Sequence, residues 1–264
     1  MQGLFVKRVG RGPRLVLLHG GVLAGELCWR QQLRLADRFA LEIVDRAGYG
    51  RSQRVSPGED LDADAPLVAG ILGEGAHLVG HSSGAVAAMM AAALRPHAVL
   101  SLTLCEPPAF QLAPGSAEAR QMARSTEEHL QRPGDDAEWL RGFLAIIDRS
   151  LAIPGQLPPV LAQGVHAVRA VRRRPWEGEL PVDQLAAASF PKLVISGNHS
   201  PAFEAVCDSL QVRLQAQRAY VTGAGHATPD TGDAFNQALV QFIGTSRPRD
   251  RPGPHISDPP ATRR

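Results

Sequence analysis

The chain has 264 residues, of which 44% are hydrophobic and 20% are charged, and its formal net charge is +2 at neutral pH. This length and composition predict a globular domain with its own core and with room for an inserted segment. The charge is too small to favour nucleic acid or an anionic membrane surface as a partner.

Three cysteines, Cys28, Cys105 and Cys207, lie far apart and have no partner at the spacing of metal ligands. We therefore expect free thiols in a reducing compartment, with neither a disulfide framework nor a metal site. The first 18 residues show no signal peptide pattern, and no apolar stretch approaches membrane-spanning length. The cytoplasm is the expected location.

Seven short runs rich in Val, Leu and Ile alternate with stretches of helical pattern. The expected strands are Leu4–Val9, Arg14–Leu18, Leu41–Asp45, His77–Gly80, Val99–Cys105, Lys192–Ser196 and Arg218–Thr222. The expected helices between them are Trp29–Phe39, Asp62–Leu72, Ser83–Leu94, Pro201–Leu210 and Asp233–Ile243. Because strands and helices alternate, and several strands are almost continuously apolar, the pattern predicts an α/β fold with a mostly parallel central sheet flanked by helices.

The alternation stops between residues 110 and 189, which hold no strand pattern. Amphipathic helical patterns occur there instead, at Ala117–Leu130, Asp135–Ile147 and Pro159–Arg173. We expect residues 110–189 to form a helical cap over one end of the sheet, inserted into a core of residues 1–109 and 190–245. Residues 246–264 are rich in proline and charge and are expected to form a disordered tail.

The segment Gly80-His81-Ser82-Ser83-Gly84 joins an expected strand directly to the expected helix Ser83–Leu94. A serine on so tight a turn has a strained backbone that exposes its hydroxyl, and glycines two residues to either side avoid collisions. The start of the helix also brings N–H groups and the positive end of its dipole beside a developing oxyanion. The pattern predicts that Ser82 is the nucleophile of a serine hydrolase.

Three further motifs occur in order along the chain: Leu17-Leu18-His19-Gly20-Gly21, Asp45-Arg46-Ala47-Gly48-Tyr49-Gly50-Arg51-Ser52 and Gly223-Ala224-Gly225-His226. With the serine turn they resemble the α/β-hydrolase superfamily, in its cap-bearing branch, over residues 4–245. The resemblance implies an α/β-hydrolase fold and an oxyanion hole formed by the backbone N–H groups of Gly21 and Ser83. It gives the turn at Asp45 a mainly structural role.

The chain has nine histidines, and His226 alone follows the last expected strand in a loop flanked by glycine. The chain order of the superfamily assigns it the role of the base that takes a proton from Ser82. His19 lies in the oxyanion loop and His81 beside the nucleophile, where each is expected to pack or to orient its neighbours.

The catalytic acid is harder to assign. The superfamily most often keeps it after the strand Lys192–Ser196, where this chain reads Gly197-Asn198-His199-Ser200 and has no carboxylate. A second position in the superfamily is the end of the strand Val99–Cys105, which Glu106 follows. A buried carboxylate there would fix the tautomer of His226 and stabilise the imidazolium that forms during attack. Glu106 is the favoured acid, and Glu204, Asp208 or no acid at all are the open alternatives.

Apolar residues of the nucleophile helix and the cap are expected either in a pocket under the cap or in the plain core; they are Met89, Met90, Phe110, Trp139, Phe143 and Phe203. The run from Arg169 to Arg174 places positive charge at the end of a cap helix. It is expected to be a solvated face, and attraction of an anionic substrate or carrier is the alternative.

A serine nucleophile excludes the dehalogenation and epoxide opening of relatives that carry aspartate at this position. The sequence therefore predicts a hydrolase that cleaves an ester, lactone or thioester bond of a small, mainly apolar molecule. The reaction would pass through an acyl-enzyme on Ser82 and would need no cofactor. The alternative is a ligand-binding or receptor-type protein, or a cofactor-free enzyme that is not a hydrolase, on the same fold. No oligomeric state is predicted.

Overall fold

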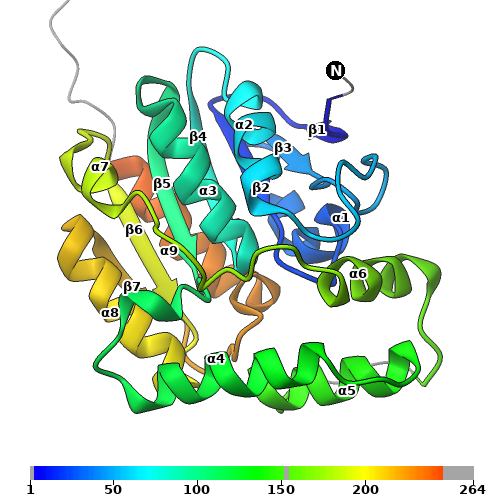
Figure 1. Ribbon diagram of the computed structural model, residues 1–264. Coiled ribbons are helices and arrows are strands. Elements are labelled where there is room, and N and C mark those ends of the chain that lie inside the picture. Colours follow the sequence, from blue (N-terminus) through cyan, green and yellow to red (C-terminus); the bar gives the residue numbers. More distant parts are fainter. Residues whose placement is uncertain (1–2, 152–154, 246–264) are drawn as a thin grey trace, which may run out of the picture.

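The computed structural model describes residues 3–151 and 155–245, and the predicted tail at 246–264 lies outside them. A seven-stranded sheet forms the centre, with strand order β1-β3-β2-β4-β5-β6-β7 (Figure 1). Only β1 runs antiparallel, to β3, and the other pairings are parallel. The strands are β1 Val6–Val9, β2 Arg14–Leu18, β3 Ala40–Val44, β4 Ala76–His81, β5 Val99–Cys105, β6 Lys192–Ser196 and β7 Gln217–Tyr220.

The sheet confirms the predicted α/β architecture, because each of the seven expected strands is present with its ends shifted by at most two residues. The alternation of side chains along β2 explains the continuous apolar pattern. Val16 and Leu18 belong to one core cluster, whereas Leu15 and Leu17 belong to the cluster on the opposite face. Both faces of the central strands are covered by helices, so both sets of residues are buried.

Helices form a layer on each face of the sheet. The first face is covered by α2 Leu61–Ile71, α3 Ser83–Leu94 and α8 Pro201–Leu214, whose apolar residues share one core cluster. The second face is covered by α9 Asp233–Thr245 and by the region of α1 Gly25–Cys28, and its core holds Trp29, Phe235 and Leu239. The resulting arrangement has three layers, helix, sheet and helix.

One expected helix is wrong. The segment predicted as Trp29–Phe39 forms instead a 3₁₀ helix at Arg30–Leu35, which follows the short α1. The buried Gln32 in that segment donates hydrogen bonds to the carbonyl of Pro229 at 2.9 Å and to the Oδ1 of Asn236 at 3.0 Å. Contacts with a distant part of the chain therefore fix this segment, and they outweigh its local helical pattern.

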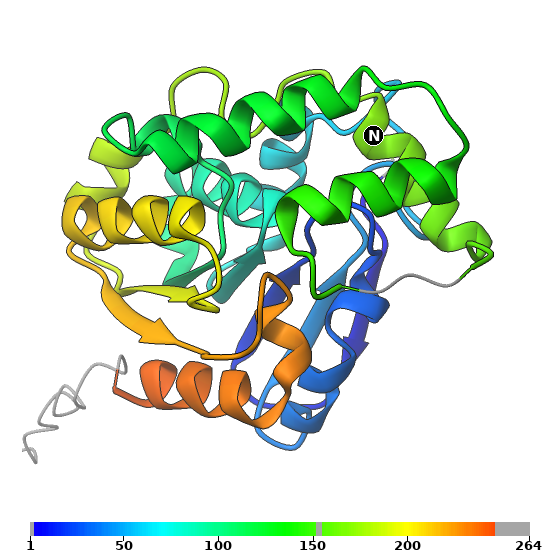
Figure 2. The ribbon, with the colours of Figure 1, turned by 90° about the horizontal axis from the view of Figure 1, so that it is seen from below.

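The stretch between β5 and β6 contains no strand among its described residues. It forms a short 3₁₀ helix at Phe110–Leu112 and the helices α4 Ala117–Leu130, α5 Asp136–Ile147, α6 Pro159–Arg169 and α7 Val182–Ala187. Figures 1 and 2 show α4 and α5 lying across the end of the sheet at which the parallel strands finish. The last helix, α7, instead packs beside α3 and α8 in the layer that covers the sheet.

Side-chain caps explain where two of these helices begin. Ser116 accepts a hydrogen bond from the backbone N–H of Ala119 at the start of α4, and Asp135 accepts from two N–H groups at the start of α5. Within the described part of the chain, no helix has the length and apolarity that a bilayer crossing requires.

Candidate active site

Ser82 lies on the turn between β4 and α3, as the sequence predicts. Its backbone has φ 54° and ψ −130°, and its N–H donates to the carbonyl of Cys105 at 2.9 Å. A Cβ added at Gly80 would lie 2.4 Å from the carbonyl oxygen of Gly84, and one at Gly84 would lie 2.2 Å from the carbonyl oxygen of His19. Both glycines are therefore required by close backbone packing around the serine, which agrees with the steric argument from the sequence.

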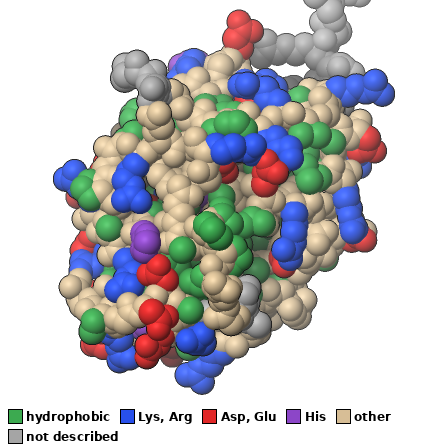
Figure 3. All heavy atoms as spheres, turned by 90° about the vertical axis from the view of Figure 1, so that its right-hand side faces the viewer, with side chains coloured by type: hydrophobic (Ala, Val, Ile, Leu, Met, Phe, Trp, Pro, Cys, Tyr) green, Lys and Arg blue, Asp and Glu red, His purple; other side chains and the backbone are tan. Residues whose placement is uncertain are grey.

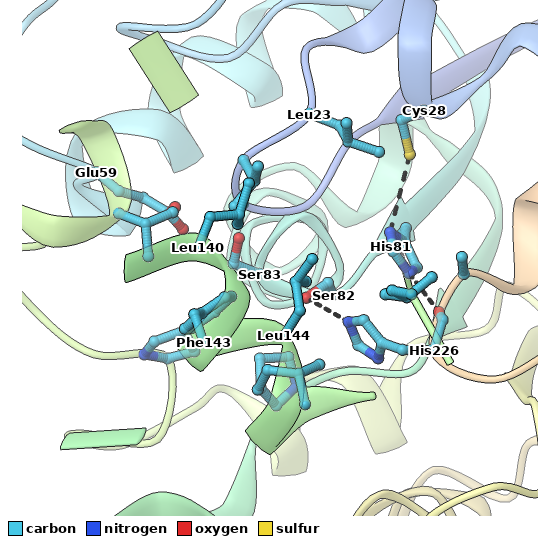
Figure 4. Close-up of a pocket in the computed structure, with 18 of the residues that line it drawn as sticks. Leu23, Cys28, Glu59, His81, Ser82, Ser83, Leu140, Phe143, Leu144 and His226 are labelled. Atoms are coloured by element: carbon cyan, nitrogen blue, oxygen red, sulfur yellow. Dashed lines mark hydrogen bonds between the residues drawn. The ribbon is translucent and has the colours of Figure 1, made fainter. Parts of the chain in front are cut away.

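His226 follows β7 and reaches Ser82. Its Nε2 lies 3.0 Å from the Oγ of Ser82, in the hydrogen bond drawn in Figure 4. The imidazole side chain is 9% exposed. This is the geometry in which a histidine can take the hydroxyl proton of a serine.

Two side chains hold the backbone of His226. His81 donates from Nε2 to the carbonyl of His226 at 2.8 Å, and the Oδ2 of Asp148 accepts from the N–H of His226 at 2.7 Å. Burial lowers the pKa of His81 to about 3, so this ring is neutral and its Nε2 carries the proton. His81 is thus an orienting residue, as the sequence analysis expected. Asp148 ends α5 and was not anticipated, since nothing in the sequence links it to the histidine loop.

Glu106 follows β5 and lies against the other nitrogen of His226. Its Oε2 is 3.3 Å from the Nδ1 of His226, and its Oε1 accepts from the N–H of Gly197 at 2.6 Å. The carboxylate is fully buried. Burial alone would raise the pKa of Glu106, but hydrogen bonds from His199, His226 and Gly197 hold it at about 2. The carboxyl group is therefore ionised at neutral pH and is able to stabilise a positive charge on His226.

The alternative acids lie elsewhere. Glu204, on α8, pairs with Arg218 at 2.6 Å and accepts from the hydroxyl of Ser196 at 2.9 Å. Asp208 is 61% exposed and lies 3.5 Å from the same guanidinium. The hydrogen bonds of the described structure bring Glu106, and neither of these two, to His226.

His199 is the second residue of the site that the sequence analysis missed. No role was predicted for it from the sequence, yet its Nε2 lies 3.0 Å from the Oε2 of Glu106. It stands in the loop after β6, where the superfamily more often keeps its acid. The only signal in the sequence was its place in that loop.

Gly21 and Ser83, the predicted oxyanion donors, both line the cavity beside Ser82. The hydroxyl of Ser83 accepts from the Nη1 of Arg46 at 3.0 Å, and the same nitrogen donates to the carbonyl of His19 at 3.2 Å. One buried guanidinium therefore ties together the two segments that would supply the oxyanion hole. That the two backbone N–H groups bind an oxyanion stays a prediction.

Arg46 is neutralised by two buried carboxylates, with Glu59 at 3.0 Å and Asp64 at 2.8 Å. Burial opposes the charge on Arg46, but these carboxylates raise its pKa above the ordinary value. Its neighbour Asp45 accepts from the N–H of Gly25 at 2.9 Å and from that of Arg51 at 3.0 Å. The turn therefore has the structural role expected of it, and Arg46 adds a support for the site that the sequence analysis did not find.

A cavity of about 530 Å³ opens beside Ser82 and His226. Its walls are mostly apolar and come from both the core and the helices between β5 and β6; they include Leu23, Leu140, Phe143, Leu144, Val168 and Phe203. Figure 4 shows several of these side chains around the serine. Of the aromatic residues and methionines expected there, Phe143 and Phe203 line the cavity, whereas Met89, Phe110 and Trp139 are buried in the core.

The arginine run that begins at the end of α6 is largely paired. Arg169 lies 3.2 Å from Asp136, Arg173 lies 2.7 Å from Asp62, and Arg174 lies 3.1 Å from Glu127. Arg174 also lines the cavity beside Ser82, so the solvated face and the attraction of an anionic substrate both stay predictions. On the face drawn in Figure 3, apolar side chains gather near the centre and charged side chains of both signs surround them.

Glu106, His199 and His226 have ligand atoms within 4.8 Å of one another, so their spacing alone would suit a metal ion. Their hydrogen bonds to one another, to Ser82 and to the N–H of Gly197 already account for the arrangement. Such a chain of serine, histidine and carboxylate is the arrangement used for nucleophilic attack on acyl groups.

Comparisons with known proteins agree with this geometry. A pimeloyl-[acyl-carrier protein] methyl ester esterase of Sodalis glossinidius is 40% identical over 264 residues, covering 92% of this chain and 98% of the relative. The enzyme of the same name from Methylococcus capsulatus is 37% identical over 152 residues, so the match spans little more than half of either protein, 54% of this chain and 56% of the relative. A thermophilic esterase from Thermogutta terrifontis has a similar structure, with a TM-score of 0.67 and 25% identity over 92% of this chain and 93% of that one.

The family model described as "Alpha/beta hydrolase family" matches residues 15–238, which include Ser82, Glu106 and His226. That span covers most of the chain and contains all the motifs on which the resemblance was based. The chain belongs to the alpha/beta hydrolase family.

Proposed function

We propose that this protein is a serine hydrolase that cleaves carboxylic esters. The observation that carries the proposal is the continuous hydrogen-bonded chain from Ser82 through His226 to Glu106, at the edge of an apolar cavity. The names of the relatives as esterases support the same reaction class.

In the proposed mechanism, the Oγ of Ser82 attacks the ester carbonyl while the Nε2 of His226 takes its proton. The N–H groups of Gly21 and Ser83 bind the oxyanion of the tetrahedral intermediate. The intermediate collapses, and His226 passes the proton to the departing alcohol. Water then attacks the acyl group on Ser82, again with His226 as base, which releases the acid and restores the serine. Glu106 stays ionised and stabilises the imidazolium at each step.

The volume and the apolar walls of the cavity support a medium-sized apolar acyl group as part of the substrate. A volume of about 530 Å³ lies within the usual range of small-molecule sites. The relatives named above point to methyl esters of acyl groups attached to an acyl-carrier protein. We propose that class as the first to test for this chain, and release of methanol from pimeloyl-[acyl-carrier protein] methyl ester is the direct measurement.

The hydrogen-bonded nucleophile separates this proposal from a ligand-binding or receptor-type member of the fold. A fluorophosphonate probe should label the native protein and fail to label Ser82→Ala. A series of p-nitrophenyl esters should be hydrolysed by the native protein, with Ser82→Ala at least about 10⁴-fold slower. Absence of both labelling and turnover in the native protein would refute the proposal.

We further propose that residues 110–189 act as the cap over a core of residues 1–109 and 190–245, because α4, α5 and α6 supply walls of the cavity. The cytoplasm is the proposed compartment. The support for it is that Cys28, Cys105 and Cys207 are all buried free thiols, as expected in a reducing environment.

A further inference from the structure

His199 and His226 share one oxygen atom of the buried carboxylate. The Oε2 of Glu106 lies 3.0 Å from the Nε2 of His199 and 3.3 Å from the Nδ1 of His226. The two rings are 6.2 Å apart between centroids. The nearer partner of that oxygen is therefore the histidine that does not touch Ser82.

The carboxylate of Glu106 depends on these contacts. Its Oε1 accepts from the N–H of Gly197, and its Oε2 has only histidine nitrogens as partners among the described residues. A fully buried carboxylate that lacks a hydrogen-bond donor raises the free energy of the folded state. The carboxylate of Glu106 therefore keeps the orientation in which all of these donors reach it. Removal of His199 would leave the oxygen that faces His226 with a single partner.

The surroundings of His199 favour a positive charge. Burial lowers its pKa, but the hydrogen bond and the charge of Glu106, together with the charges of Asp148 and Glu204, raise it above the ordinary value. The ring stacks on Phe203 with the centroids 5.8 Å apart. The charged or titratable groups nearest to it are Glu106 after β5, His226 after β7, Asp148 at the end of α5 and Glu204 on α8, and Glu118, Arg124 and Arg149 line the same cavity as His199.

A second cavity gives His199 its own route to solvent. This cavity has a volume of about 940 Å³ and lies between α4, the end of α5 and the loop after β6. His199 and Asp148 line it, whereas Ser82, Glu106 and His226 are absent from its lining. His199 can thus exchange protons with water while a substrate fills the first cavity.

We propose that His199 is a positioning residue for ester cleavage, which holds the same oxygen of Glu106 that contacts His226 and makes the interaction between Glu106 and His226 depend on pH through the second cavity. The inference rests on the proposed function. A cationic His199 partly compensates the negative charge of Glu106, which weakens the attraction of Glu106 for a cationic His226. A neutral His199 still donates a hydrogen bond from its Nε2–H, but it no longer compensates that charge.

Two substitutions separate the hydrogen bond from the charge. His199→Ala removes both, so kcat for a p-nitrophenyl ester should fall about tenfold while KM changes little. His199→Gln keeps a donor without a charge, so it should restore most of kcat. In both variants the acid limb of the kcat/KM profile should move to higher pH by about one unit, because a cation near His226 has been removed.

His166→Gln is the matched control, since this histidine is 58% exposed, pairs with Asp136 and lines neither of the two cavities. Its kcat and pH profile should equal those of the native protein. The proposal is overturned if both His199 variants keep the native kcat and acid limb. It is also overturned if His199→Ala loses kcat, His199→Gln does not restore it and the acid limb stays in place, because that pattern indicates only a structural role.

A measurement without substrate tests the coupling separately from the proposed function. By NMR, the His199 ring should titrate above pH 6.5 in the native protein and at lower pH in Glu106→Gln. Equal midpoints in the two proteins would overturn the coupling even if the ester is cleaved. Conversely, a native protein that cleaves no ester but shows the difference in midpoints would refute the proposed function and leave the coupling of the two residues standing.

Discussion

Four non-glycine residues around the site have a positive φ: Val22 with 69°, Ser82 with 54°, Glu106 with 49° and Asn198 with 52°. Such conformations are unfavourable for residues with a Cβ and persist only where the surroundings impose them. At Glu106 the N–H donates to the carbonyl of Ile195 at 3.0 Å, which anchors the residue to β6. Part of the strain therefore lies at Ser82 and Glu106, whose side chains must both reach His226.

Glu106→Gln should lower kcat about 10³- to 10⁴-fold, because the amide leaves His226 without a negative charge and with a poorly matched partner. The measurement is turnover of a p-nitrophenyl ester, with circular dichroism to show that the variant folds. Asp208→Asn is the control and should stay within about twofold of the native rate, since Asp208 is 61% exposed and remote from His226. A large loss in Asp208→Asn and none in Glu106→Gln would move the acid to α8.

The ionisation of Glu106 also predicts how stability depends on pH. Its pKa falls from 4.5 to about 2 on folding, with burial opposing the shift and the hydrogen bonds from His199 and His226 causing it. A lowered carboxyl pKa stabilises the fold above pH 4.5, and this stabilisation is lost as the pH falls through 2. The free energy of unfolding should therefore drop by about 3 kcal/mol across that interval from this group. Urea titrations at several pH values should show a shallower drop in Glu106→Gln, and an equal drop would contradict the assignment.

The sequence was sufficient for residues whose chemistry is tied to a local motif. Ser82 was evident from its turn, and His226 from a glycine-flanked loop at the expected place in chain order. Glu106 could only be favoured, because its contact with His226 joins positions 120 residues apart. The roles of His199, Asp148 and Arg46 could not be found, since each acts through partners that only folding brings near.

At the level of elements, Arg46 connects the turn after β3 to α2 and to the start of α3. Replacement by methionine would leave Glu59 and Asp64 as uncompensated buried charges, so Arg46→Met should cost about 3–5 kcal/mol of unfolding free energy. Arg51→Met is the control in the same turn. Arg51 is 54% exposed, and its loss should cost at most about 1 kcal/mol. Urea unfolding measures both, and comparable losses would show that the buried cluster contributes no more than a surface ion pair.

Elements were predictable where their local pattern and their packing agree. β2 is buried from Leu15 to Leu18, which form a continuous apolar run, and α4 begins at a serine cap and was expected with its observed bounds. The helix predicted at Trp29–Phe39 was wrong because the hydrogen bonds of Gln32 to distant residues outweigh the local helical pattern. The helix α7 was not expected, since its 6 residues are too few to show a clear period.

For the molecule as a whole, the region of α6 packs directly against the backbone of the core. A Cβ added at Gly164 of α6 would lie 1.9 Å from the carbonyl oxygen of Val22, next to the oxyanion loop, and one at Gly58 would lie 1.7 Å from that of Ala170. These backbone contacts leave no room for a side chain. Glycine therefore allows α6 to lie close against the loop after β2, where Val22 and Val168 both line the cavity.

Gly164→Ala should displace α6 and lower kcat/KM for long acyl esters by about tenfold, with a smaller effect on an acetyl ester that needs less of the cavity. The chain-length series of p-nitrophenyl esters measures this difference. Gly70→Ala, on α2, is the control, because a Cβ there meets nothing within 4 Å and should leave the series unchanged. An equal loss for all chain lengths in Gly164→Ala would show general destabilisation instead of a change in the cavity.

The position of His226 has a consequence for how the protein becomes active during synthesis. Ser82 and Glu106 follow the adjacent central strands β4 and β5, but His226 follows β7, the strand at the edge of the sheet. On the ribosome, the nucleophile and the acid emerge more than a hundred residues before the base. The nascent chain therefore stays inert toward esters until its last strand docks, and the return of activity in a refolding experiment reports the completion of the sheet.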